Sequence, residues 1–476
     1  MICRIIITHL LFEFHSFIII LTNTSEGVSM SCLAIISEYN PYHNGHAYLL
    51  QEAKARTGAE HSLSVMSGNF SQQGSPMLFP KLLRASAAAT SGIDLVFELP
   101  VLFATGSAGD FASGAVSLLN RLHCVDYLCF GVEDENTELF HRIAECLADE
   151  SPEYQSVLSD AMRDGKSFPA ARENALAAIL GDEIRPILQK PNNILALEYI
   201  TALTKTGSTI RPVLIRRKGS YHPDSPTDRM KETNLSQNDG FLSATEIRNR
   251  IEEFLSSDQI TGKEKENNLS DYLLSNLPEE SFKIILPEIT TMLRYSSSAG
   301  MSDFDDRLTP YLVSTVVNAK TNASHGYVPE DENLPMDMSR DLLRRLMNLP
   351  LPLTWTEAVD HLNTRDMTKG RVRRALLHFI LGITDRDRTM IRSGGSALYA
   401  NLLSARKEST FLLRSIQETA EIPIITKRSA FIPEKESPAS RLWALDIAAS
   451  DLYHQMYCDT WGIRNKDELR STPVII

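Results

Sequence analysis

Short apolar runs alternate with helical patterns from residue 32 to about residue 217 of the chain. The runs are rich in β-branched and aromatic side chains and are bounded by turn residues, which is typical of strands. Strands that alternate with helices indicate βαβ units, so we expect an α/β fold with a Rossmann-like parallel sheet. The predicted strands cover residues 33–37, 62–66, 94–99, 127–130 and 212–215.

The helices between these strands are marked by their ends as well as by their periodicity. Residues 46–57 and 81–90 are each followed closely by a glycine that can stop a helix. Residues 108–122 carry apolar side chains at helical spacing. An acidic helical stretch over 138–180 then interrupts the alternation before Pro191 starts another helix.

The second half of the chain begins with a polar stretch and continues mainly as helices. Residues 218–242 contain two prolines and several Asp, Asn and Ser, which predicts a long mobile loop before a helix at Ser243. Charge and proline predict two further connections, at 257–280 and 321–339. The helices expected beyond them cover 338–347, 355–362 and 369–381.

The length of 476 residues allows two to four domains. We expect an α/β domain over residues 30–256 and a mainly helical domain over 257–476. Residues 1–29 are interpreted as a non-native extension, because their apolar runs are interrupted and Met30 stands directly before the first strand. No segment has the roughly 20 apolar residues of a spanning helix, so no membrane association is expected.

Composition narrows the possible partners. The chain is 43% apolar and 23% charged, as in globular proteins, and its net charge of −12 argues against a protein that coats DNA or RNA non-specifically. A local basic face remains open, since residues 341–428 hold 15 Lys and Arg against 9 Asp and Glu. The six cysteines form no CxxC pair, which predicts neither a zinc site nor a disulfide framework and favours a cytoplasmic protein with no protein-bound metal.

The segment from Ser37 to His46 directly follows the first predicted strand and contains His-x-Gly-His at 43–46. The start of a helix offers backbone N–H groups and a positive dipole to phosphates. His43 and His46 would then stabilise charge as pyrophosphate leaves an ATP α-phosphate, and Gly45 would let the adenine approach the backbone. Two surface histidines on a helix would give the same four-residue pattern.

A second motif, Ser-x-Thr-x-x-Arg, is formed by Ser243, Thr245 and Arg248 at the start of a predicted helix. Ser243 with Glu246 also makes a capping box, which is the plain alternative. Two hydroxyls and a guanidinium at a helix start suit the β- and γ-phosphates of a nucleotide. In this order on a βαβ scaffold, the two motifs resemble the adenylyl-transferring superfamily of pantetheine-phosphate adenylyltransferases and class I aminoacyl-tRNA synthetases.

Further segments narrow this resemblance. Residues 38–46 read Glu-Tyr-Asn-Pro-Tyr-His-Asn-Gly-His, which extends beyond the common core of the superfamily. With this segment the chain is similar to the bacterial tRNA(Met) cytidine acetate ligase family, most densely between residues 33 and 250. The other segments that carry the resemblance are 66–70, Lys81 with Arg84, 92–100, 111–115, 130–131, 190–195 and 221–222.

The resemblance implies an ATP-dependent ligase that forms acetyl-adenylate and acetylates N4 of the wobble cytidine of elongator tRNA(Met). ATP is then a substrate, accompanied by Mg²⁺, and acetate and tRNA are the other partners. By the same resemblance the ATP-binding residues are Ile36, Ser37, Glu38, Tyr39, Asn40, Pro41, Tyr42, His43, Asn44, Gly45, His46, Ala47, Tyr48, Leu49, Gly131, Asn192, Arg216 and Arg217.

These added positions lie where a sheet binds ligands, at the carboxyl ends of strands. Each also has a plain alternative: Gly131 as a turn residue, Asn192 as a helix cap, and Arg216 with Arg217 as a solvated strand end.

The tRNA-binding prediction rests on basic side chains. Four of them open the predicted helix 369–381, whose apolar residues leave a basic face suited to an RNA backbone. Solvated charges on an ordinary amphipathic helix are the alternative. The predicted tRNA-binding residues are Lys81, Arg84, Lys369, Arg371, Arg373 and Arg374.

Two other functions compete with this interpretation. A nucleotidyltransferase that adenylylates a small phosphorylated metabolite would share both motifs, but such enzymes are compact and lack over 200 further residues. A non-catalytic RNA-binding protein would keep the fold and not the motif residues, all of which are present here.

Overall fold

A computed structural model of the protein describes residues 31–218, 240–256, 262–296, 304–324, 330–365 and 367–476. The extension predicted for residues 1–29 lies outside these ranges. Most of the loop predicted at 218–242 also lies outside them, together with Tyr221 and His222. Within the described ranges, no helix combines the length and the apolar character needed to cross a bilayer.

The described residues form one eight-stranded sheet in the order β5-β4-β1-β2-β3-β6-β7, with β8 paired to β6 beside β7. The strands from β1 to β5 are parallel, which confirms the predicted Rossmann-like sheet. Their bounds are β1 Cys32–Ser37, β2 His61–Ser67, β3 Leu95–Leu99, β4 Tyr127–Val132 and β5 Arg211–Arg216.

Helices cover both faces of these parallel strands, so β1, β2 and β3 are buried along almost their whole length. Ile35 on β1 pairs with Ser64 on β2, and Ser64 pairs with Val96 on β3. The helices of this part are α2 Asn44–Thr57, α3 Lys81–Thr90, α4 Val101–Ala104, α5 Ala108–Leu122, α6 Thr137–Asp149, α7 Pro152–Arg163, α8 Phe168–Leu180, α9 Arg185–Leu188 and α10 Pro191–Thr206.

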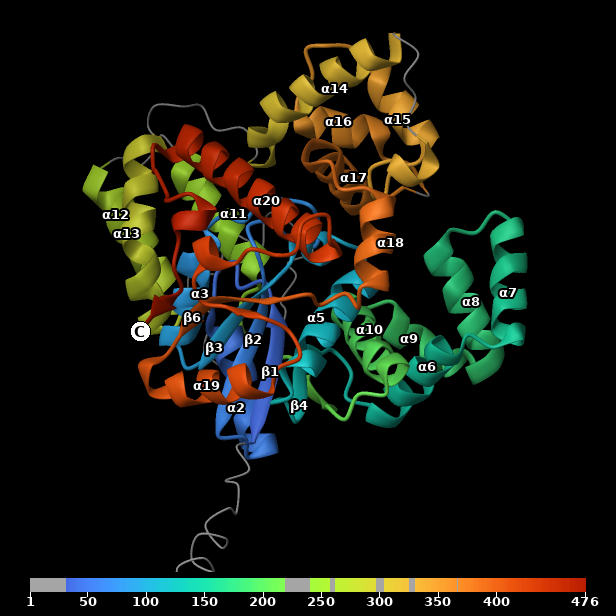
Figure 1. The fold of residues 1–476 in the computed structure, drawn as a ribbon, viewed down its shortest axis with the longest axis horizontal. Helices are drawn as coiled ribbons and strands as arrows, with labels where there is room; N and C mark the ends of the chain where they lie inside the picture. The colour runs from blue at the N-terminus through green and yellow to red at the C-terminus, as the bar shows by residue number, and fades with distance from the viewer. Residues whose placement is uncertain (1–30, 219–239, 257–261, 297–303, 325–329, 366) are drawn as a thin grey trace, which may run out of the picture.

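The predicted helical stretch 138–180 is three helices, of which α7 and α8 pack against each other away from the sheet (Figure 1). Ser151 and Ser167 interrupt it, because each precedes a new helix that has a proline within its first two residues, Pro152 and Pro169.

The second half of the chain is mainly helical, as predicted, and α14 to α17 form a cluster of their own beyond α18 and α20 (Figure 1). The prediction of a connection at 257–280 is wrong, because most of this segment forms helix α12. The helices are α11 Ala244–Ser256, α12 Gly262–Asn276, α13 Glu279–Ser296, α14 Thr309–Ser324, α15 Arg340–Met347, α16 Trp355–Leu362, α17 Lys369–Leu381, α18 Asp385–Ser393, α19 Thr410–Thr419 and α20 Pro438–Trp461.

Three strands of the C-terminal region return to the sheet, which the hydrophobic pattern did not reveal. Strand β6 (Ala400–Ala405) runs antiparallel to β3, and β7 (Ile424–Ile425) and β8 (Val474–Ile475) pair with its outer edge. The division into two domains at residues 256 and 257 stays a prediction. The sheet contains strands from both predicted domains.

A buried group of charges ties this returning segment to the first half. The Lys81 ammonium, on α3, lies 2.7 Å from a Glu98 carboxylate oxygen on β3 and 2.9 Å from Glu468 Oε1. Arg428 Nε lies 2.9 Å from the same Glu468 oxygen. Glu98 also accepts a hydrogen bond from the Asn401 amide on β6. All four charged side chains are at most 5% exposed.

We predict that Glu468→Ala lowers the free energy of unfolding by about 3–5 kcal/mol, because it leaves two buried cations without that carboxylate. Urea denaturation at pH 7 measures the change. The matched control is Glu421→Ala, which removes the exposed pair with His123 and should cost less than about 1 kcal/mol. Equal effects of the two substitutions would contradict the role of the buried group.

Candidate functional site

The candidate site lies where the strand order reverses. Strand β1 has β4 on one side and β2 on the other, so the segment after Ser37 leaves the sheet at the point where successive crossovers diverge. Open α/β sheets bind ligands at this point, outside the carboxyl ends of the strands. In Figure 1 these ends point upward, toward α11 and α20.

His43 and His46 cap helix α2 reciprocally. His43 Nδ1 accepts a hydrogen bond from the Gly45 N–H at 3.0 Å, and His46 Nδ1 accepts one from the His43 N–H at 3.2 Å. The ring centroids are 3.9 Å apart. Because both Nδ1 atoms accept, the proton of each neutral ring resides on Nε2, which leaves two N–H donors for a ligand.

Gly45 is required by this arrangement for a reason that the sequence did not reveal. A Cβ atom at this position would lie 2.7 Å from Cε1 of the His43 ring. The missing side chain therefore makes room for the capping imidazole. The predicted approach of adenine to Gly45 stays a prediction.

Burial keeps both imidazoles neutral at physiological pH. It lowers the pKa of His43 to about 3, and the cations of Arg217 and Arg248 add to this shift. The pKa of His46 is also lowered well below its ordinary value, by burial first and then by His43 and Arg217. A ligand bound here would therefore meet N–H donors on the imidazoles and positive charge on the two arginines.

Arg217 lies at the end of β5, where its side chain crosses Gly131. A Cβ atom at Gly131 would lie 3.2 Å from Arg217 Cγ, so glycine permits this close passage. One guanidinium nitrogen lies 3.4 Å from Asn192 Oδ1, and burial lowers the pKa of Arg217. The neighbouring Arg216 is exposed and stands apart from the histidine pair; its backbone N–H donates to Glu135.

Glu133 orients Asn192 and was missed by the sequence analysis. One carboxylate oxygen accepts from the Asn192 amide at 2.5 Å, and the other accepts from the Asn193 N–H at 3.0 Å. The Asn193 side chain in turn accepts from the Glu133 N–H at 2.9 Å. Two asparagines at a helix start and an acidic residue just beyond β4 were the available signal.

Arg248, of the Ser-x-Thr-x-x-Arg motif, contacts the segment that leads into the His-x-Gly-His motif. Its guanidinium donates to the Asn40 carbonyl at 2.8 Å and to Thr245 Oγ1 at 3.0 Å. Ser243 and Glu246 form the predicted capping box, in which the Glu246 N–H donates to Ser243 Oγ at 3.2 Å. The start of α11 is thus fixed against the segment that precedes His43.

Two of the predicted tRNA-binding residues lie inside the protein. Lys81 belongs to the buried charge group described above. Arg84 is fully buried and donates to four backbone carbonyls, those of Glu38, Ser67, Gly68 and Phe79. The prediction of RNA contact at these two positions does not fit their burial, because all their hydrogen bonds serve the interior.

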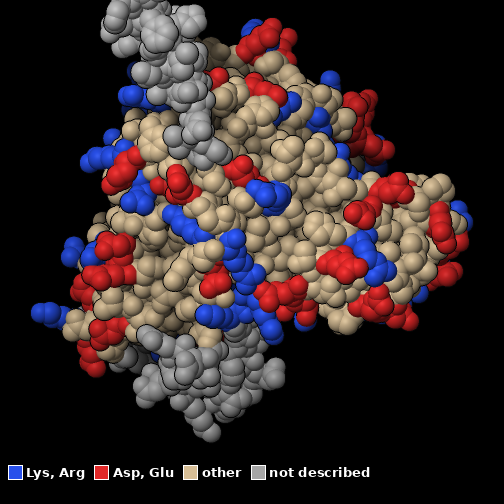
Figure 2. Space-filling view, turned by 90° about the horizontal axis from the view of Figure 1, so that it is seen from below, with Lys and Arg blue, Asp and Glu red and all other residues tan. Residues whose placement is uncertain are grey.

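The basic residues of α17 divide into two groups. Arg374 is 12% exposed and bonds Asp337 at 2.9 Å, and Arg373 lies 3.2 Å from Asp305. Lys369 and Arg371 remain half exposed, at 54% and 47%, although each lies near an aspartate. Figure 2 shows the face seen from below in the view of Figure 1. Lys and Arg are interspersed with Asp and Glu on this face.

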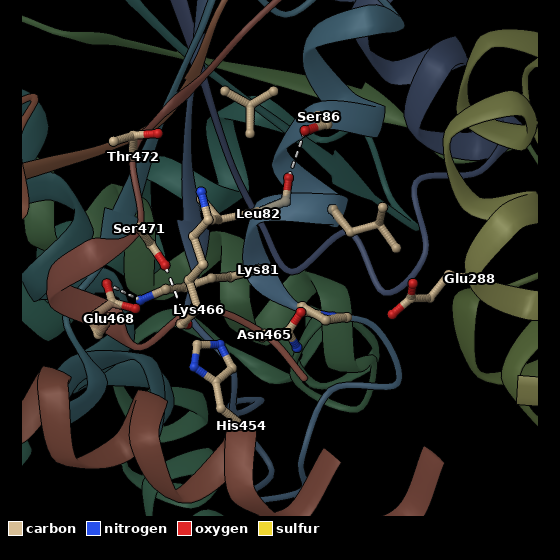
Figure 3. A pocket seen from close by; sticks show the side chains of 13 residues that line it. Lys81, Leu82, Ser86, Glu288, His454, Asn465, Lys466, Glu468, Ser471 and Thr472 are labelled. Atoms are coloured by element: carbon tan, nitrogen blue, oxygen red, sulfur yellow. Dashed lines mark hydrogen bonds and ion pairs between the residues drawn. The ribbon is translucent and has the colours of Figure 1, made fainter. Parts of the chain in front are cut away.

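A cavity of about 390 Å³ lies apart from these residues. Figure 3 shows it between α3, α20 and the C-terminal residues, with Lys81, His454 and Lys466 among its side chains. Its charges are mixed, and Lys81 is already bonded to Glu98 and Glu468. None of the predicted ATP-binding residues lines it.

The sequence is similar to those of known proteins along most of its length. The family described as HIGH Nucleotidyl Transferase matches residues 30–468. A tRNA(Met) cytidine acetate ligase of Acetivibrio thermocellus is 33% identical, across 90% of this chain and 95% of the relative. The protein of the same name from a Thermoanaerobacter species is also 33% identical, across 90% of this chain and 96% of its own length.

Solved structures agree with the sequence relatives. The crystal structure of Thermotoga maritima TmcAL bound with alpha-thio ATP matches with a TM-score of 0.74 and 26% identity, and covers 94% of this chain and 100% of that one. The apo structure of the same protein gives a TM-score of 0.76 and 27% identity over the same shares.

The neutral state of His43 predicts how stability depends on pH. Its pKa of about 3 in the folded protein lies below the ordinary value of about 6.5, so the unfolded chain binds a proton first as the pH falls. Stability is therefore lost on acidification below pH 6.5, by about 2 kcal/mol at pH 5 from this residue alone. We expect His43→Asn to lose less stability than the wild type in urea denaturation between pH 7.5 and 5. Parallel curves for the two proteins would contradict a buried neutral His43.

Proposed function

The chain belongs to the tRNA(Met) cytidine acetate ligase family of HIGH nucleotidyl transferases, and we propose that its site acetylates N4 of the wobble cytidine of elongator tRNA(Met). It is an ATP-dependent ligase, with ATP as a substrate. The observation that carries the proposal is the pair of neutral histidines at the reversal point of the sheet, His43 buried and His46 half-buried, with Arg217 and Arg248 beside them.

We propose that the first step joins acetate to the α-phosphorus of ATP. An acetate oxygen attacks phosphorus, the bond to the β-phosphate oxygen breaks, and pyrophosphate leaves with the electron pair. The Nε2–H groups of His43 and His46 would donate to the phosphate oxygens that gain charge. Mg²⁺ would enter with the nucleotide, since it is usually held by substrate phosphates.

Arg217 and Arg248 are proposed to supply positive charge to the triphosphate. Asn192 fixes the position of Arg217, and Thr245 fixes that of Arg248. Both side chains are partly buried, and this burial lowers the pKa of each guanidinium below its ordinary value. A phosphate that enters would replace the solvation lost to this burial, so binding and charge stabilisation use the same groups.

The remaining assignments are proposals of the same kind. Residues 36, 37 and 39–49 with Gly131 and Arg216 complete the proposed ATP site, and Ser243 is assigned to the outer phosphates. The Glu38 carboxylate, predicted with them, is not proposed to hold ATP, because its negative charge repels phosphates. The half-exposed Lys369 and Arg371 are proposed to hold the tRNA backbone, which gives residues 257–476 the RNA-binding part. Because its proposed substrate is a tRNA, the protein is proposed to act in the cytoplasm.

The direct test of this function is a product assay. The protein is incubated with ATP, labelled acetate and bulk tRNA, and the digested RNA is examined for N4-acetylcytidine. We expect label in N4-acetylcytidine only when ATP is present. Label that appears in the nucleotide but in no RNA would show activation without transfer and would contradict the proposed acceptor.

His46→Ala is predicted to lower acetate-dependent pyrophosphate exchange by at least a hundredfold, because one donor to the phosphate oxygens is lost. The control is His454→Ala, which removes a histidine that lines the separate cavity. Thermal unfolding checks that both variants fold. Exchange at the wild-type rate in His46→Ala would remove the histidine pair from the chemistry.

Lys369→Ala with Arg371→Ala is predicted to weaken tRNA binding and to flatten its dependence on salt. Each lost phosphate contact lowers the slope of log affinity against log salt by about 0.7 to 0.9. Filter binding at several salt concentrations measures the slope. Arg142→Ala with Arg163→Ala, on exposed residues of α6 and α7, is the charge-matched control. Equal slopes in the two double variants would show that α17 does not contact the RNA.

A further inference from the structure

Glu38 is the first residue after β1, and its carboxylate is only partly committed to the protein. The side chain is half-buried, and Oε1 accepts a hydrogen bond from the Gln72 N–H at 2.7 Å. Among the described residues, no hydrogen bond or ion pair occupies Oε2. One oxygen therefore fixes the carboxylate, while the other is available to a ligand at the carboxyl end of the strand.

The backbone around Glu38 is held from beneath by Arg84. This buried guanidinium donates to the Glu38 carbonyl and also to the carbonyls of Ser67 and Phe79, at 3.1 and 2.9 Å. These contacts join the ends of β1 and β2 to helix α3. A carboxylate on so rigid a support can hold a reacting group in place, which a mobile surface glutamate does not do.

Glu38 also shares its surroundings with the proposed nucleotide site. Arg248 bonds the carbonyl of Asn40, only two residues further along the chain. The charged and titratable groups that face Glu38 are Arg84 on α3, Arg248 on α11 and Tyr199 on α10. Burial, and then Glu38, raises the pKa of Tyr199, so this phenol stays neutral.

On its other side Glu38 is connected to the helix that carries the proposed tRNA contacts. The loop that supplies the Gln72 N–H packs at Gly74 against α17, where a Cβ would lie 2.7 Å from the Arg374 backbone nitrogen. Ser75, in the same loop, donates to Asp305 at 2.9 Å. Glu38 thus stands between the phosphate-binding arginines and the start of α17.

We propose that the Glu38 carboxylate binds the N4 amine of the acceptor cytidine and takes its proton during acetyl transfer. The assignment rests on the proposed function and adds the residue that the activation step does not require. Carboxylates accept hydrogen bonds from the exocyclic amine of cytosine, which gives the site a reason to select this base.

The step balances as follows. The N4 lone pair forms a bond to the acetyl carbonyl carbon, and the bond from that carbon to the adenylate oxygen breaks, so AMP leaves with the electron pair. One N4 proton passes to Glu38 and then to solvent. The products are N4-acetylcytidine, AMP and one proton.

The test separates the two steps in Glu38→Gln. The substituted amide retains an oxygen for the Gln72 N–H, so the local structure is preserved. Acetate-dependent pyrophosphate exchange measures activation. Rapid mixing of preformed enzyme-bound acetyl-adenylate with tRNA measures single-turnover transfer. We expect transfer to fall by about 10²–10⁴-fold, as for loss of a general base, and to fall at least tenfold more than exchange. The control is Glu52→Gln on α2, which removes a carboxylate paired with Arg56 outside the site.

The conservative variant provides a readout that a merely structural residue would not move. Glu38→Asp keeps a carboxylate and should retain part of the transfer rate that Glu38→Gln loses, which also keeps the test valid if the glutamine variant is unstable.

Three outcomes would overturn the assignment. Equal losses in exchange and transfer would assign Glu38 to activation, and an unchanged transfer rate in Glu38→Gln would remove it from the reaction. A wild-type protein that activates acetate but forms no N4-acetylcytidine would overturn the proposed function, and the assignment with it. The wild-type arm therefore distinguishes the two failures.

Discussion

The buried charges of Lys81, Glu98, Arg428 and Glu468 are the constraint on which the whole arrangement depends. Charges removed from water are costly unless each one is paired, so none of these four can be withdrawn alone. They come from a helix beside the sheet, from a central strand and from the end of the chain. Their pairing requires β6 to lie against β3, and this makes the last hundred residues part of the architecture that positions the site.

In the candidate site, the same two imidazole rings cap a helix and offer hydrogen-bond donors to a ligand. His43 and His46 use Nδ1 to cap α2, and this use determines which nitrogen of each ring carries the proton. Helix capping by hydroxyl or carboxylate side chains is more usual, but those groups would leave acceptors where phosphates are proposed to bind. Imidazole is the side chain that can accept on one edge and donate on the other.

The sequence predicted what depends on local pattern and missed what depends on distant partners. Strands β1 to β5 were found because apolar runs buried on both faces are visible in a short window. Strand β6 was not found, since its pairing with β3 joins residues some 300 positions apart. Helix α12 was taken for a connection because few of its side chains are apolar. Lys81 and Arg84 were assigned to tRNA because their charge is visible in the sequence and their burial is not. Lys81 bonds Ser450 and Glu468, 369 and 387 positions away, and Arg84 bonds backbone carbonyls up to 46 positions away.

The order in which the sheet is assembled has a consequence for synthesis. Strand β3 ends at Leu99, and its neighbour β6 begins at Ala400. At about 5–20 residues per second, a ribosome needs roughly 15–60 seconds to extend the chain from one to the other. During that interval β3 is an open edge, the kind of surface that pairs with other chains. The nascent protein therefore passes through a window in which chaperone protection matters, and a chain that stops before residue 400 retains that open edge permanently.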